Sequence, residues 1–200
     1  MVGSEAQLEA MARRIIDGNR YMTIATVDGD GRPWVTPVYF NPDGYRHMYW
    51  ISSPEAQHSR NLAIRPAVSI VVFDSQVRIG DAEAVYMRAH AQEITKPTSE
   101  ECAVAFQPRF EGVKAFGPDE LRPPAKLRLY RATVTEHWVL IRGNDPVWGR
   151  GTDSLCGRLA VIAVMSNRRD KRLLVAGRDY LPSGLAIPAR GSGHRGLSDS

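Results

Sequence analysis

Residues 20–75, RYMTIATVDGDGRPWVTPVYFNPDGYRHMYWISSPEAQHSRNLAIRPAVSIVVFDS, decide the fold class of this 200-residue chain. Three β-rich runs in it are separated by DGDG at 28–31 and NPDG at 41–44, two sequences that favour tight turns. A small polar loop and a short helical segment over 56–64 follow. The next run, AVSIVVF at 67–73, is nearly continuous in apolar residues, which predicts a strand covered on both faces.

The flanking sequence adds two helices and two long strands. Ser4 and Gln7 form a capping-box pattern for a helix over 5–17, and Gly18 suits a left-handed stop. Strands are expected in EAVYMRAHAQEI and KLRLYRATVTEHWVLI, with a helix over 98–106 between them. Six strands with few helices predict a mainly β protein, a six-stranded antiparallel barrel with flanking helices.

Charge and composition divide the chain into a folded body and a tail. Residues 151–200 hold eight Lys or Arg against four Asp, so their surplus of 8 − 4 = +4 equals the net charge of the whole chain. Their Gly, Pro, Ser and Arg-rich composition predicts a basic, flexible tail. Residues 1–150 form one expected domain with 18 basic and 18 acidic side chains, and this balance argues against a nucleic-acid partner.

The sequence gives no sign of a membrane segment, a disulfide or a metal centre. No run approaches the ~18 to 20 apolar residues of a membrane helix, and the start of the chain reads as a helix rather than a cleavable signal. Cys102 and Cys156 form no CxxC pair, and His47, His90 and His137 lack histidine partners at metal-binding spacing. We expect a cytoplasmic protein with free thiols and no metal site.

A polar cluster follows the third strand-like run. Ser52, Ser53, His58, Ser59 and Arg60 lie within nine residues, between a predicted strand and a predicted helix. Hydroxyl donors combined with cationic side chains are the groups that bind a phosphate. The cluster therefore predicts a phosphate-binding loop, with a solvated loop as the simpler alternative.

Pro37 marks the second strand-like run as unusual. Because proline has no N–H to donate, this residue belongs at a bulge, at a sheet edge or beside a neighbour that is not a strand. A flat ligand could be that neighbour, with the backbone around Pro37 bonding to its polar edge.

Together these segments, over about residues 5–142, resemble the FMN-binding split-barrel family similar to pyridoxamine 5′-phosphate oxidase, within the flavin and deazaflavin oxidoreductases. The resemblance implies a homodimer that binds FMN in clefts between its subunits. It implies that the flavin ring lies along Thr36, Pro37 and Val38, and that the phosphate is held by a set of side chains in the polar cluster: Ser52, Ser53, His58 and Arg60. His58 stands where relatives often have a phosphate-binding lysine.

Departures from the family pattern bear on the reaction. The Arg-x-His substrate pair of true pyridoxamine-phosphate oxidases is absent after Trp138, and Asn41 replaces a substrate-binding lysine. The resemblance therefore implies an FMN-dependent oxidoreductase that transfers hydride to or from an unidentified small molecule, rather than vitamin B6 oxidation. The alternatives are a deazaflavin-dependent reductase and a non-catalytic flavin- or haem-binding module; a haem would need a histidine axial ligand. Tyr39, Trp50 and Trp138 lie on predicted strands that a monomer would struggle to cover, and these aromatic side chains are expected to favour the dimer.

Overall fold

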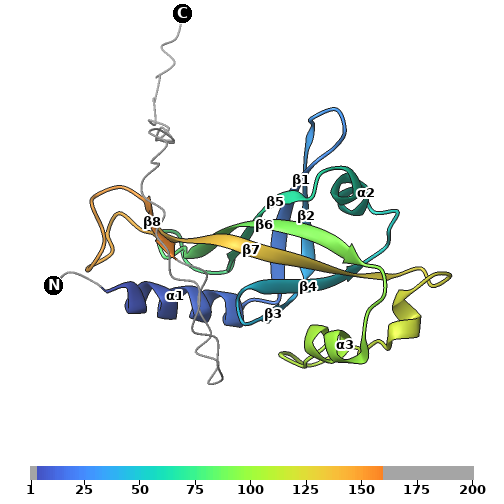
Figure 1. The fold of residues 1–200 in the computed structure, drawn as a ribbon. Helices are drawn as coiled ribbons and strands as arrows, with labels where there is room; N and C mark the ends of the chain where they lie inside the picture. Colours follow the sequence, from blue (N-terminus) through green and yellow to red (C-terminus); the bar gives the residue numbers. More distant parts are fainter. Residues whose placement is uncertain (1–3, 160–200) are drawn as a thin grey trace, which may run out of the picture. The chain divides into compact units, whose positions relative to one another are not determined.

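The computed structural model describes residues 4–159, which contain three α-helices, one 3-10 helix and eight strands (Figure 1). The helices are α1 (Glu5–Gly18), α2 (Gln57–Ile64), α3 (Ser99–Ala105) and η1 (Pro118–Leu121). The strands are β1 (Tyr21–Val27), β2 (Pro33–Tyr39), β3 (Asn41–Asp43), β4 (His47–Ser52), β5 (Ala67–Phe73), β6 (Ala84–Ile94), β7 (Arg128–Ile141) and β8 (Ser154–Leu159).

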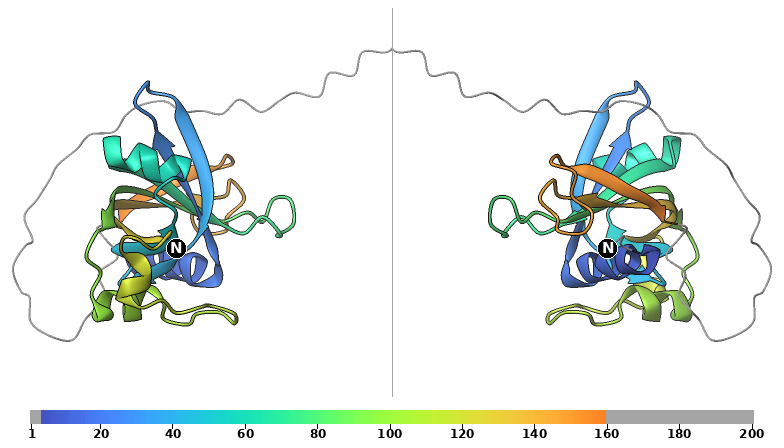
Figure 2. Two further views of the ribbon diagram at one scale, coloured as in Figure 1. Left: turned by 90° about the vertical axis from the view of Figure 1, so that its right-hand side faces the viewer. Right: turned by 90° about the vertical axis from the view of Figure 1, so that its left-hand side faces the viewer.

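All eight strands belong to one antiparallel sheet in the order β2-β1-β5-β6-β7-β4-β3, and β8 pairs with β7. The sheet curls so that β2 contacts β4 without pairing to it, and this gap is the split of the barrel. Figure 2 shows the curl from two sides. The mainly β split barrel with flanking helices is confirmed.

The strand count and the tail differ from expectation. Two further strands, β3 and β8, join the six that were predicted. Strand β8 lies beyond residue 150, where the folded domain was expected to end. It forms because the chain after β7 turns back and pairs with β7 in antiparallel orientation. Residues 160–200, the rest of the expected tail, lie outside the described residues.

Side-chain alternation along the strands divides the interior into two apolar clusters. The larger fills the curl of the sheet against α1, and the smaller lies between the other face of β4 and β7 and helix α3. Consecutive residues of β4 illustrate the division, because Trp50 belongs to the first cluster and Tyr49 to the second. Among the described residues, no helix is both long and apolar enough to cross a membrane.

Helix α1 begins as predicted but ends differently. The Ser4 N–H donates to Oε1 of Gln7 at 2.7 Å, which is one half of a capping box. Gly18 stays helical, and Asn19 ends the helix in an extended conformation, so the left-handed stop was wrong. The physical reason is Arg109, whose guanidinium donates to carbonyl oxygens at the end of this helix: those of Ile16 at 2.7 Å, Asp17 at 3.0 Å and Asn19 at 3.2 Å.

Strand β5 is covered on one face only in the described chain. Its residues alternate between buried and exposed, with Val68, Ile70 and Val72 inside and Ser69 and Phe73 outside. The expectation of cover on both faces was therefore wrong for a single chain. The apolar side chains on the outer face of β5 are not covered by any described segment of this chain.

Candidate functional site

Strand β2 presents an edge that pairs with no other strand in residues 4–159. Its inner edge pairs with β1 in the register Ile24–Thr36, Thr23–Pro37 and Met22–Val38. Val38 is buried, Thr36 is half-buried and Pro37 is exposed. Among the described residues β2 is thus an edge strand, which is one of the positions predicted for Pro37.

The end of β4 and the start of α2 lie across the split from β2, which contacts both elements. Ser52 ends β4, and Ser53 accepts a hydrogen bond on its Oγ from the Glu55 N–H at 3.1 Å. Ala56 is the N-cap residue of α2 and offers no side-chain acceptor to the first turn. The free N–H groups of a helix start attract anions, so this turn suits a phosphate.

His58 lies in the first turn of α2 and is only 4% exposed. Its Nε2 atom is buried and has no hydrogen-bond partner among the described residues. Burial lowers the pKa of His58, so the imidazole is neutral near pH 7. A buried polar atom left unpaired costs about 1–3 kcal/mol, and an oxygen of a bound phosphate would remove that cost.

Arg60 is exposed and is held close to the same turn. Its guanidinium donates to the carbonyl oxygen of Glu55 and, at 2.8 Å, to Oε1 of Gln57. The hydroxyl-bearing loop thus leads directly into the turn that carries His58, and Arg60 contacts the end of that loop at Glu55.

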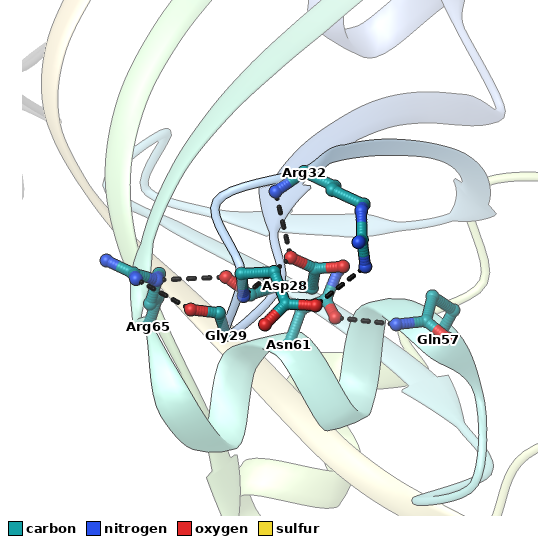
Figure 3. Close-up of polar contacts among 7 residues, drawn as sticks. Asp28, Gly29, Arg32, Gln57, Asn61 and Arg65 are labelled. Atoms are coloured by element: carbon teal, nitrogen blue, oxygen red, sulfur yellow. Dashed lines mark hydrogen bonds and ion pairs between the residues drawn. The ribbon is translucent and has the colours of Figure 1, made fainter.

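Arg65 fixes α2 against the hairpin that joins β1 and β2 (Figure 3). It donates from Nε to the carbonyl oxygen of Asp28 at 3.0 Å and from a terminal nitrogen to that of Gly29 at 3.1 Å. Within the same interface, Asn61 donates to Oγ1 of Thr26 at 3.0 Å. These contacts hold α2 against β1 and the hairpin that follows it.

A cavity of about 640 Å³ adjoins the split and was not predicted from the sequence. It lies between β4 and the segment that follows α3, and its walls include Tyr39, which follows Val38, and Ile51, which precedes Ser52. Seven of its fifteen lining residues are aromatic: Tyr21, Tyr39, Tyr49, Trp50, Phe106, Phe110 and Phe116. The available sequence signal was the recurrence of phenylalanine in a segment otherwise typical of a loop.

Asn41 positions that segment. Its Nδ2 donates to the carbonyl oxygens of Ala105 at 2.9 Å and Gln107 at 2.7 Å, and the residue is buried. The side chain that replaces the family's substrate-binding lysine thus serves to hold one wall of the cavity.

The remaining histidines do not converge on a site. His47 contacts Thr133 at 3.3 Å, and His137 is fully buried with its Nε2 donating to the carbonyl oxygen of Tyr45 at 3.0 Å. His90 is exposed on β6. No group of three or more His, Cys, Asp or Glu side chains in residues 4–159 could hold a metal ion.

Comparison with known proteins places the chain among split-barrel proteins. The model of the family described as pyridoxamine 5′-phosphate oxidase matches residues 8–137. Heme oxygenase HutZ of Vibrio cholerae is 32% identical over 74 residues, which are 36% of this chain. The match spans only 40% of that relative's length.

Two solved structures extend the similarity in fold. A heme binding protein from Mycobacterium smegmatis matches with a TM-score of 0.56 and 19% identity, over 81% of this chain and 61% of its own. The structure of HutZ, described as the heme storage protein from Vibrio cholerae, matches with a TM-score of 0.51 and 22% identity, over 74% of this chain and 97% of its own. At these identities the likeness concerns the fold.

Proposed function

Because this chain belongs to the pyridoxamine 5′-phosphate oxidase family, we propose that it binds FMN at the split between β2 and α2 and acts as a flavin-dependent oxidoreductase. The flavin ring would lie along the backbone of Thr36, Pro37 and Val38. Ser52, Ser53 and the first turn of α2 would hold the phosphate.

The observation that supports this most directly is the unpartnered Nε2 of His58. A buried donor or acceptor is normally satisfied, so an exception needs a physical reason. Here the atom belongs to the first turn of a helix without a side-chain cap, and the loop that carries Ser52 and Ser53 precedes that turn in the chain. These are the groups that would bind a phosphate oxygen.

The chemistry of the reaction would come from the cofactor, because a bound flavin supplies hydride transfer by itself. The protein would bind the ring, orient it and limit the access of water. Such a role needs no acid–base pair, in line with the lack of a catalytic set among the described histidines. The substrate would be a small molecule other than a vitamin B6 phosphate. The Asn41 side chain, which replaces the family's substrate-binding lysine, already donates to the carbonyl oxygens of Ala105 and Gln107.

A haem-binding module is the second candidate, because the names of HutZ and of the mycobacterial protein describe them through haem. The described part of this chain gives it less support. No histidine lines the aromatic cavity in residues 4–159, and the imidazoles of His47 and His137 already contact Thr133 and Tyr45. A deazaflavin coenzyme would use the same strand and would need a basic groove for its acidic tail.

Titration of the purified full chain separates these candidates. FMN should bind about ten- to a hundredfold more tightly than riboflavin, because the phosphate adds charge-assisted hydrogen bonds of roughly 1.5–3 kcal/mol. Flavin fluorescence quenching measures both affinities, and a haemin titration followed in the Soret region gives the competing value. Equal affinities for the two flavins, or tight binding of haemin alone, would rule out the proposed phosphate site.

The functional unit would be a homodimer that covers the outer face of the sheet. Of the aromatic side chains expected to favour the dimer, Trp50 is buried in the core of the single chain, so that expectation was wrong for Trp50. Strand register places five residues in one row across the outer face, and they include Trp138: Pro37, Thr23, Val71, Tyr86 and Trp138. Cross-strand partners share a face, so the row is continuous, and it is partly or largely exposed in the described chain. Because the row starts at Pro37, a second copy packed against it would also cover the proposed ring strand.

Tyr86→Asp should convert the dimer to a monomer at micromolar concentration. A charge in the centre of an apolar interface loses its hydration without gaining a partner, which costs several kcal/mol. Sedimentation velocity measures the change, and Gln76→Asp, at an exposed position of the loop between β5 and β6, is the matched control. A wild-type chain that is monomeric while loaded with flavin would contradict the dimer.

A further inference from the structure

The segment between α3 and η1, residues 106–117, is attached to the rest of the chain mainly through side chains. None of its residues is buried, and no backbone N–H of residues 109–116 donates a hydrogen bond to any group in residues 4–159. Segments with an exposed backbone and few buried apolar contacts open at a small cost in free energy. Because residues of this segment form one wall of the aromatic cavity, its position decides how far that cavity is open.

Arg109 makes the strongest of these attachments. Its guanidinium donates to the carbonyl oxygen of Phe40 at 3.1 Å, in addition to the three carbonyl oxygens at the end of α1. The same group lies 5.1 Å from the centre of the Phe40 ring and 5.2 Å from that of Phe110. Hydrogen bonds from a charged donor are stronger than those between neutral groups. One side chain therefore ties the segment both to the end of α1 and to the residue that follows β2.

The other attachments lie at the two ends of the segment or are weak. Asn41 holds its beginning through the carbonyl oxygens of Ala105 and Gln107. Lys114 approaches Glu120 at 3.4 Å, and such an exposed ion pair contributes little. Gly112, at φ 82°, turns the backbone midway in a conformation that glycine adopts without strain. Release of Arg109 would thus free the residues between these ends together.

A buried thiol lies in the apolar cluster that this segment covers. Cys102 of α3 is 5% exposed and belongs to the smaller cluster, against which Phe106 and Phe116 pack. Burial raises the pKa of the Cys102 thiol, which makes it less reactive. Lifting the two rings from the cluster would uncover it, so the reactivity of Cys102 reports the position of the segment.

We propose that residues 106–117 form a lid that opens as one unit and that Arg109 is its latch. In the closed state Arg109 caps α1 and binds the Phe40 carbonyl. In the open state α1 loses its cap, the phenylalanine rings leave the smaller cluster and the aromatic cavity loses one wall. The latch also joins the lid to the end of the strand that would carry the flavin ring. That last link rests on the proposed function, whereas the lid does not.

Labelling of Cys102 with dithiobis(nitrobenzoate) in the flavin-free full chain measures opening. Cys156→Ser leaves Cys102 as the single thiol of the chain, and a buried thiol reacts only after it is uncovered. Local opening exposes little surface, so the labelling rate should rise only slightly with urea below the unfolding transition. Opening by global unfolding would follow the full urea dependence of the unfolding equilibrium.

Three variants in the Cys156→Ser background test the latch. Arg109→Met should speed labelling about ten- to a hundredfold with the same shallow urea dependence, the factor expected for one lost hydrogen bond from a charged donor. Arg109→Lys keeps the charge but not the several donors, and its rate should fall between. Lys114→Met, in the same segment, is the matched control and should change the rate less than about twofold. Circular dichroism verifies that each variant keeps the fold.

A steep urea dependence in the chain with Cys156→Ser alone would show that Cys102 is uncovered only by global unfolding, and it would overturn the lid without recourse to any variant. An unchanged rate in Arg109→Met, or equal acceleration by Arg109→Met and Lys114→Met, would overturn the latch. If Arg109→Met does not fold, Arg109→Lys decides the same point. Flavin is absent from every sample, so these outcomes are separate from the success or failure of FMN binding.

Discussion

His58→Leu is expected to weaken FMN binding at least tenfold while leaving the free protein as stable as the wild type or more stable. The two effects have one cause, the Nε2 atom that is buried without a partner in the described structure. Leucine is of similar size and has no polar atom to satisfy, so the unpaired group no longer costs free energy. The same change removes a hydrogen bond to the phosphate, and one to a charged group contributes roughly 1.5–3 kcal/mol.

Three measurements decide this prediction. Flavin fluorescence gives the FMN affinity, riboflavin serves as the ligand without a phosphate, and thermal unfolding of the flavin-free protein gives the stability. His90→Leu, at an exposed histidine of β6, is the matched control and should change none of them. A loss of stability together with equal losses for both flavins would show that His58 supports the fold instead.

His137→Gln should remove part of the acid sensitivity of the fold. Burial lowers the pKa of His137 to about 4, from an ordinary value near 6.5, even though its hydrogen bond to Tyr45 acts in the opposite direction. Between these two pH values the unfolded chain binds a proton that the folded chain excludes, so the free energy of unfolding falls as the pH falls. The full difference of about 2.5 pH units corresponds to about 3 kcal/mol.

Urea unfolding at a series of pH values between 7 and 4 measures this contribution. The decrease in unfolding free energy should be about 3 kcal/mol smaller in His137→Gln than in the wild type, because glutamine does not titrate in this range. Some acid sensitivity should remain, since burial also lowers the pKa of His47 and His58. Identical pH profiles would mean that His137 is protonated in the folded state without cost.

The sequence by itself determined the elements whose signals are local. Gly31 adopts φ 86° in the predicted DGDG hairpin, where the residue type alone favours the turn. Thr98 is the N-cap residue of helix α3, and its Oγ1 accepts from the Glu101 N–H at 3.1 Å. The alternation and length of the apolar runs, with the resemblance to the family, then sufficed for the split barrel. These features depend on residues close together in the chain, so a pattern of a few positions specifies them.

Features that join distant segments were decided only by the tertiary structure. Arg109, some ninety residues from the end of α1, provides the contacts that were expected from a left-handed Gly18. The aromatic cavity needs β4 and the segment after α3 to lie face to face, and Asn41 holds the latter in place through backbone contacts that no sequence spacing reveals. The position of His58 was read correctly as the start of a helix, but its burial depends on how α2 packs against β1 and β2. Local propensity specifies where helices and turns begin and end. Burial, pKa shifts and cavity shape depend on how helices and strands far apart in the sequence pack against one another.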